Sequence, residues 1–173
     1  MARFAQRLGL TRFEADEYYK QALEAYSKKK LNEAILAMEQ AMEWLPNNAE
    51  YYAARGFFYL EDGVVPKAEE DFEKALQIYP YETIAHYGRG IIAYKSKNWD
   101  EALAHFTDAY RSNPERPETL YYLGLVHHHK RENEQALIYM EQAQAIFIEA
   151  GDKRKTDAGK WVREMKKIIK QRD

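Results

Sequence analysis

Three consecutive histidines, His127, His128 and His129, are the side chains that most suggest chemistry, because imidazole binds metals and titrates near neutral pH. Successive residues of a helix point about 100° apart, so the three rings cannot converge on one ion. We therefore predict no metal site and no cofactor. His128 and His129 are expected to face a binding surface, where they would make binding depend on pH.

Catalysis would need a nucleophile, an acid or a base in a recognisable pattern, and the sequence offers none. It contains no phosphate-binding loop, no nucleophile elbow and no paired-histidine zinc motif, so we predict that the protein is not an enzyme. It has no cysteine, which excludes disulfides and favours a reducing compartment, and we expect a cytoplasmic protein. No run approaches the roughly 20 apolar residues that cross a bilayer, so no membrane contact is expected.

Charge is the remaining chemical signal, and it is uneven. From residue 152 to the end, nine lysines or arginines stand against four acids, which gives +5 and leaves −7 on the preceding residues. Such a tail could meet the phosphates of a nucleic acid. This alternative is less favoured, because the acidic body would repel a polyanion and because a solvated terminal helix explains the same charges.

The elements that position these side chains follow from a repeat of 34 residues. Prolines recur at this step, and so do a small residue, two alanines and one bulky apolar residue. These columns are Pro46, Pro80 and Pro114; Ala22, Gly56, Gly90 and Gly124; Ala34, Ala68, Ala102 and Ala136; Ala41, Ala75, Ala109 and Ala143; and Met38, Phe72, Phe106 and Met140. Each unit is predicted to be a helical hairpin, because small residues allow close helix approach and proline ends a helix.

The predicted helix pairs are 11–28 and 32–44, 48–61 and 65–79, 82–95 and 98–112, and 116–129 and 132–148. The fourth unit has Ile148 where the others have proline, so its second helix is expected to run on towards Gly151. Apolar residues from Ala158 to Ile169, at steps of three and four, predict a last helix with a basic face that seals the stack. The predicted organisation is an N-terminal arm (1–10), four units (11–148) and a C-terminal capping helix (149–173).

These columns resemble those of the tetratricopeptide repeat (TPR) family over roughly residues 15–148. The chain departs from the family before the small residue, where the usual leucine is replaced by Gln21, Arg55 and Arg89 and kept only as Leu123. We expect the arginine stems to cover apolar surface with their charge in water. The resemblance implies an all-α fold, a right-handed solenoid of four helix-turn-helix TPR units, whose first helices line a concave surface for a peptide or helix of a partner.

Residues on that surface are predicted from spacings of three and four along each first helix. The predicted groove consists of Tyr19, Leu23 and Tyr26; Ala53, Phe57 and Leu60; Tyr87, Ile91 and Tyr94; and Tyr121, Tyr122, Leu125 and His128. Nearly all are aromatic or aliphatic, which suits the apolar side chains of a bound segment. The alternative is that several of them pack between units as core.

The best known binding device of the family that this chain resembles is a clamp of lysine, asparagine and arginine that grips a terminal carboxylate. The matching positions hold Tyr19 and Leu23, then Ala54, then Ile84 and Gly88, so the clamp is not expected. We predict a protein-interaction scaffold or adaptor whose groove takes an apolar peptide or amphipathic helix. The second hypothesis is self-association through the groove or the solenoid ends, with the N-terminal arm and its Phe4, Leu8 and Leu10 as a candidate.

Overall fold

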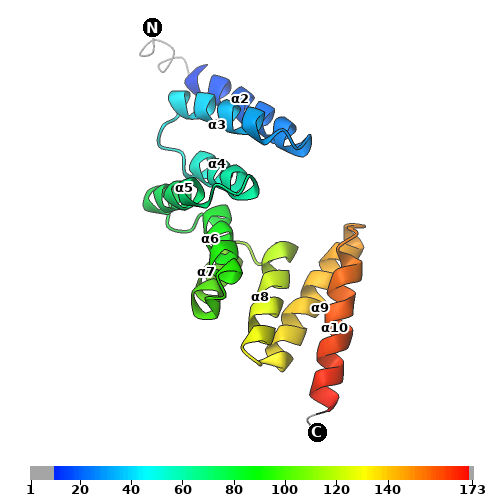
Figure 1. Cartoon of the computed structure of the whole chain (residues 1–173). Coiled ribbons are helices and arrows are strands. Elements are labelled where there is room, and N and C mark those ends of the chain that lie inside the picture. The colour runs from blue at the N-terminus through cyan, green and yellow to red at the C-terminus, as the bar shows by residue number, and fades with distance from the viewer. Residues whose placement is uncertain (1–9, 172–173) are drawn as a thin grey trace. The chain divides into compact units, whose positions relative to one another are not determined.

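The computed structural model describes residues 10–171, and all regular secondary structure in that range is helical, which confirms the all-α prediction. The helices (Figure 1) are α2 (Leu10–Ser27), α3 (Leu31–Trp44), α4 (Ala49–Glu61), α5 (Val65–Ile78), α6 (Thr83–Lys95), α7 (Trp99–Ser112), α8 (Pro117–His129), α9 (Asn133–Glu149) and α10 (Lys155–Lys170). Helices α2 to α9 begin and end within one residue of the predicted bounds. Of the predicted N-terminal arm, residues 1–9 lie outside the described part of the chain.

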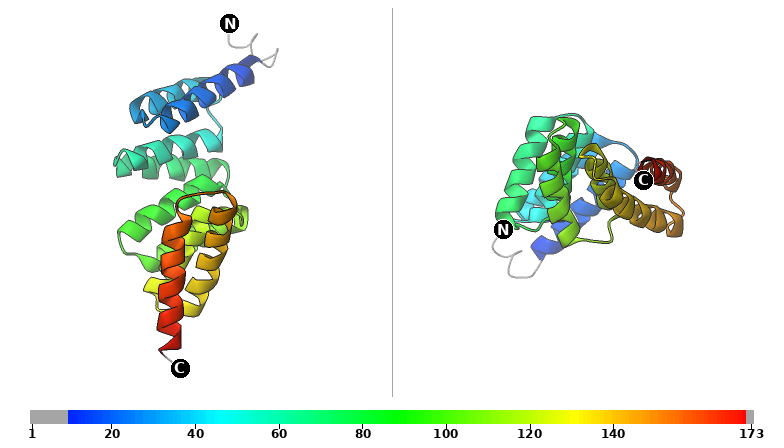
Figure 2. Two further views of the ribbon diagram at one scale, coloured as in Figure 1. Left: turned by 90° about the vertical axis from the view of Figure 1, so that its right-hand side faces the viewer. Right: turned by 90° about the horizontal axis from the view of Figure 1, so that it is seen from below.

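The chain divides within α6 into two compact halves, Met1–Gly88 and Arg89–Asp173. In the N-terminal half, α2 packs on α3, α3 on α4, and α4 on α5. In the C-terminal half, α7 packs on α8, α8 on α9, and α9 on α10. The left view of Figure 2 shows α9 and α10 side by side and antiparallel. Each half is therefore built from helices that pack on their neighbours in sequence.

The bulky column of the repeat interlocks with the small column. Met38, Phe72, Phe106 and Met140 are all fully buried. A Cβ added to Gly56 would lie 2.9 Å from the ring of Phe72, and one added to Gly90 would lie 2.7 Å from the ring of Phe106. Any larger residue in the small column would therefore clash with the bulky side chain of the same unit, which explains why both columns recur.

The turn inside each hairpin repeats at the same 34-residue step. Lys29, Gly63, Lys97 and Arg131 adopt φ angles of 60°, 80°, 60° and 65°. At the third turn, the N–H of Lys97 donates to the carbonyl of Tyr94 (3.0 Å) and the N–H of Asn98 donates to that of Ala93 (2.9 Å). This is the Schellman pattern that satisfies the last carbonyls of a helix. Sequence inspection missed this column because only Gly63 is a glycine.

The last helix begins at Lys155. Helix α9 lacks a terminating proline and continues to Glu149, and Gly151 then turns the chain with a φ of 66°. The Asp152 carboxylate accepts a hydrogen bond from the N–H of Arg154 (2.8 Å) and shapes the turn into α10. Ala158, which lies 34 residues after Gly124, is fully buried. In the repeat frame, α10 thus stands where the first helix of a further unit would stand.

Candidate functional site

The most exposed residue of the predicted groove is Leu23 on α2. Tyr26 meets Phe57 edge-on with ring centroids 6.1 Å apart, and the Phe57 ring lies 6.2 Å from that of Tyr87. Leu23 shares this side of α2 and is 43% exposed, whereas Tyr19, Tyr26 and Phe57 are half-buried. We call these four side chains, Tyr19, Leu23, Tyr26 and Phe57, the α2–α4 face. It offers an aliphatic side chain among aromatic rings.

Carboxylates border one end of the α2–α4 face. The hydroxyl of Tyr19 donates to Glu50 (2.7 Å), and that of Tyr51 donates to Asp16 (3.2 Å). Burial, the hydrogen bond to Glu50 and the charges of Glu50 and Glu82 raise the pKa of Tyr19, and burial with the nearby Asp16 raises the pKa of Tyr51 to about 12. Both hydroxyls are therefore protonated donors at neutral pH. The acidic border would favour a positively charged group on a bound segment.

Other predicted groove residues are part of the core. Ala53, Leu60 and Tyr87 are buried in the N-terminal half, and Ile91 and Leu125 are only 7% and 6% exposed in the C-terminal half. Their side chains contribute to packing and leave little surface for a partner. The residues of the predicted groove that can contact a partner are therefore the half-buried and exposed ones.

In the C-terminal half, α10 contacts the predicted groove residues of α8. The hydroxyl of Tyr121 donates to Asp157 (2.5 Å), and the ring of His128 lies 5.3 Å from that of Trp161. Tyr122 stacks on Phe106 at 5.1 Å. None of these half-buried side chains is as exposed as Leu23, so the α2–α4 face is the better candidate for a partner.

The three histidines point to three different neighbours. The Nδ1 atom of His127 lies 2.6 Å from Glu132, and that of His128 lies 2.8 Å from Asn133. His129 stacks on Trp99 with centroids 4.2 Å apart and planes 4° apart, so it is held by α7. Burial lowers the pKa of His129, and the charges of His128 and Lys97 lower it further. Among the described residues, no three His, Asp or Glu side chains are placed to hold a metal ion.

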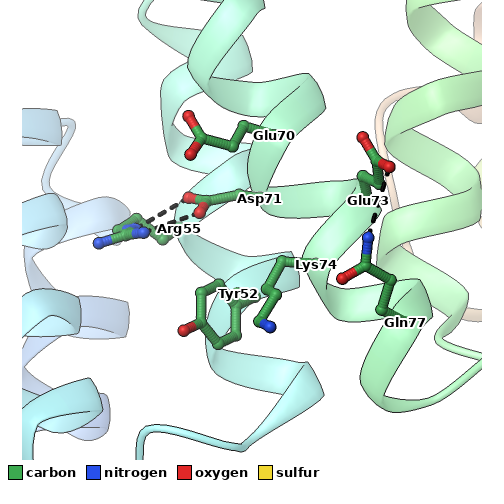
Figure 3. Close-up of a pocket in the computed structure, with 7 residues that line it drawn as sticks. All are labelled: Tyr52, Arg55, Glu70, Asp71, Glu73, Lys74 and Gln77. Carbon is green, nitrogen blue, oxygen red and sulfur yellow. Dashed lines mark hydrogen bonds and ion pairs between the residues drawn. The ribbon is translucent and has the colours of Figure 1, made fainter.

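A polar pocket that sequence inspection missed lies on α4 and α5 (Figure 3). Its volume is about 460 Å³, and its lining residues are Tyr52, Arg55, Glu70, Asp71, Glu73, Lys74 and Gln77. The guanidinium of Arg55 donates two hydrogen bonds to the buried Asp71, through Nε (2.8 Å) and Nη2 (2.7 Å). The expectation that the charge of Arg55 lies in water was wrong, because the guanidinium binds the buried Asp71 and the Arg55 side chain is only 20% exposed. The signal available in the sequence was an acid, Asp71, in a column that holds Ala37 in the first unit.

Burial and hydrogen bonding oppose each other at Asp71. Burial raises the pKa of its carboxyl, and the hydrogen bonds from Arg55 lower it, with burial the larger effect. Glu39 on α3 lies 3.9 Å from Arg55, so this guanidinium faces two carboxylates. The pocket therefore has charged walls of both signs.

None of the helices between residues 10 and 171 combines the length and apolar character needed to cross a membrane.

Comparisons with known proteins agree on one family. A family model described as tetratricopeptide repeat matches residues 87–154. The Arabidopsis thaliana Hsp70-Hsp90 organizing protein 3 is 25% identical over 95 residues, which are 55% of this chain and 17% of that protein. The Bos taurus SGT1 homolog is 31% identical over 80 residues, 46% of this chain and 24% of that protein. The chain thus spans less than a quarter of the length of these curated relatives.

Solved structures share the fold. The structure of Pseudomonas aeruginosa pilF has a TM-score of 0.77 at 21% identity, over 94% of this chain and 71% of that one. The first TPR of Spaghetti (RPAP3), solved with an HSP90 peptide, has a TM-score of 0.64 at 19% identity, over 69% of this chain and 98% of that one. The family model thus identifies residues 87–154 as tetratricopeptide repeat, and the solved structures show that the chain shares the helical-repeat fold.

Proposed function

We propose that the protein is a non-catalytic adaptor that binds an apolar peptide or helix of a partner protein on the α2–α4 face. The observation that carries this proposal is the exposure of Leu23 among the half-buried rings of Tyr19, Tyr26 and Phe57. Aromatic rings around an aliphatic side chain form an apolar surface, and covering it with an apolar residue of a partner lowers the free energy. The acidic border formed by Glu50 and its neighbours adds a preference for a cation next to that residue.

The relatives support protein binding and leave the binding mode open. The first TPR of RPAP3 binds the HSP90 peptide SRMEEVD, and two relatives are Hsp70-Hsp90 organizing proteins. In this chain, Tyr19, Leu23 and Ala54 stand where a carboxylate clamp would need lysine and asparagine. We therefore propose recognition through apolar side chains and not through a terminal carboxylate. The absence of cysteine keeps the cytoplasm as the proposed location.

The proposal is tested with peptides selected from a random display library against the wild-type chain. Leu23→Glu is expected to weaken the selected peptides at least about tenfold in anisotropy titrations, equivalent to about 1.4 kcal/mol, because it puts a charge where an apolar contact forms. The matched control is Leu36→Glu on α3, where an exposed leucine lies outside the proposed face. Both positions are exposed, so helicity should be unchanged in both variants. Ile91 would be a poor choice for this test, because it is buried.

A second arm separates the two binding modes. The peptide SRMEEVD with a free carboxylate and the same peptide with a C-terminal amide should bind equally weakly. Strong binding that depends on the free carboxylate would reject the apolar mode. Equal weakening by Leu23→Glu and Leu36→Glu would reject the α2–α4 face as the binding surface.

A further inference from the structure

The two halves of the chain carry opposite charge. Residues 10–88 contain fifteen acids and eight lysines or arginines, whereas residues 89–171 contain twelve acids and fifteen lysines or arginines, six of them on α10. This separation leaves each half with an excess of charge of one sign. It makes a surface of one half complementary to a surface of the other.

The cations of α10 form a fixed stripe. Lys160, Arg163, Lys167 and Lys170 recur at steps of three, four and three, so they share one side of the helix, and all are exposed. The opposite side of α10 is anchored in the core by Ala158, Val162 and Met165. Lys166, at the flank, already pairs with Glu141 of the adjacent α9 at 2.7 Å. We call Lys160, Arg163, Lys167 and Lys170 the α10 stripe.

The polar pocket on α4 and α5 is its electrostatic counterpart (Figure 3). Asp71 and Arg55 neutralise each other, and Glu39 adds a second carboxylate beside the same guanidinium. Glu70 and Glu73 are exposed on the pocket wall, with Lys74 as the remaining cation. The pocket and its edge thus carry an excess of negative charge. Its volume, about 460 Å³, admits the end of a lysine or arginine side chain.

We propose that the α10 stripe of one copy docks on the α4–α5 pocket of a second copy. The members of the α10 stripe are all cations, so the contact is electrostatic and depends on ionic strength. The two surfaces differ, which makes the contact head-to-tail, and such contacts build rings or open chains. This inference does not depend on peptide binding to the α2–α4 face, because it uses different side chains.

The oligomeric state in solution tests the proposal. Sedimentation velocity of the full chain at about 20 mM salt should show a mass that rises with protein concentration, and about 500 mM salt should return it to the monomer, because salt screens exposed charges. Lys167→Glu with Lys170→Glu should abolish the association, and so should Glu70→Lys with Glu73→Lys. The control Glu14→Lys with Glu61→Lys changes the net charge by the same amount as Glu70→Lys with Glu73→Lys. Its two acids are exposed and lie outside the pocket, so the association should stay intact.

Charge exchange gives the decisive result. All four substitutions at 70, 73, 167 and 170 in one chain should restore association, because the attraction is preserved with its signs reversed. A monomer under all conditions would overturn the proposal, and so would equal loss in the Glu14 and Glu61 control. If the wild type stays monomeric and Lys167→Glu with Lys170→Glu abolishes retardation of a single-stranded oligonucleotide, the α10 stripe serves a nucleic acid and the proposal is wrong.

Discussion

Arg55 and Asp71 occupy positions whose residues vary among the units of the chain from charged to apolar. The column of Arg55 holds Leu123 in the fourth unit, and the column of Asp71 holds Ala37 in the first. Each of the two positions therefore accepts an apolar residue in at least one other unit. Buried ion pairs often contribute little net stability. Arg55 and Asp71 therefore depend on each other, because either charge would destabilise the fold if it were buried without its partner.

Arg55→Leu is expected to destabilise the chain by about 2–4 kcal/mol, because it leaves the buried Asp71 carboxylate without its donors. Arg55→Leu with Asp71→Ala should recover most of that loss, and urea denaturation of the four chains in the cycle measures the coupling. Additive losses would show that the pair is not coupled.

The loss should also depend on pH. The folded-state pKa of Asp71 is raised above 3.8 by burial, and removing the Arg55 hydrogen bonds raises it further. An acid whose pKa is higher in the folded state than in the unfolded state stabilises the fold at pH values below its unfolded pKa. That contribution to stability is lost as pH rises through its folded pKa. Arg55→Leu should therefore be closer to the wild type in stability at pH 4 than at pH 7.

At the scale of the element, the hairpin turns store backbone strain. Lys29, Lys97 and Arg131 take the left-handed conformation that costs an L-residue roughly 1–2 kcal/mol, and the corresponding turn of the second hairpin has Gly63 instead. The Schellman hydrogen bonds hold all four turns in this shape. The helices thus impose the turn conformation on residues that do not prefer it.

Lys97→Gly should stabilise the chain by a few tenths to about 1 kcal/mol, since relief of strain exceeds the added freedom of the unfolded chain. Gly63→Ala should destabilise the chain by about 1 kcal/mol. The cost comes from the backbone alone, because nothing lies within 4 Å of the added Cβ. Both changes in stability are measured as shifts of the urea denaturation midpoint at an unchanged m-value. A loss of stability in Lys97→Gly would mean that the lysine side chain contributes more than its backbone costs.

The sequence was sufficient to predict what the repeat encodes directly. The prolines mark helix ends, and the small and bulky columns mark contacts inside a hairpin. The bounds of eight helices could therefore be predicted to within one residue. The Arg55–Asp71 pair and the burial of Ile91 and Leu125 could not be predicted, because they depend on which neighbouring helix covers a given side. The same limit applies to the candidate site: periodicity identifies residues on one side of a helix without showing how much of that side is covered.

At the scale of the whole molecule, stability in a repeat array is a sum over neighbouring contacts, so a change in one place should spread only locally. Met165→Asp places a carboxylate in the core that joins α10 to α9. Hydrogen exchange should show faster exchange in α8, α9 and α10 and unchanged exchange in α2 to α5. Glu164→Asp, which places the same residue at the adjacent exposed position of that helix, is the control and should alter neither region. Uniform acceleration along the chain would show one cooperative unit instead.

Ala158 follows Gly124 at the same 34-residue step as the earlier members of its column, and it is buried among Met140, Phe147 and Val162. The last helix therefore meets a surface of the kind that every hairpin offers to its successor. Duplicating the segment 117–150 in the gene would insert a module whose two ends meet partners they already fit. The length of this array is thus open to change by whole-module duplication, because α10 would pack on the duplicated module as it packs on the present one.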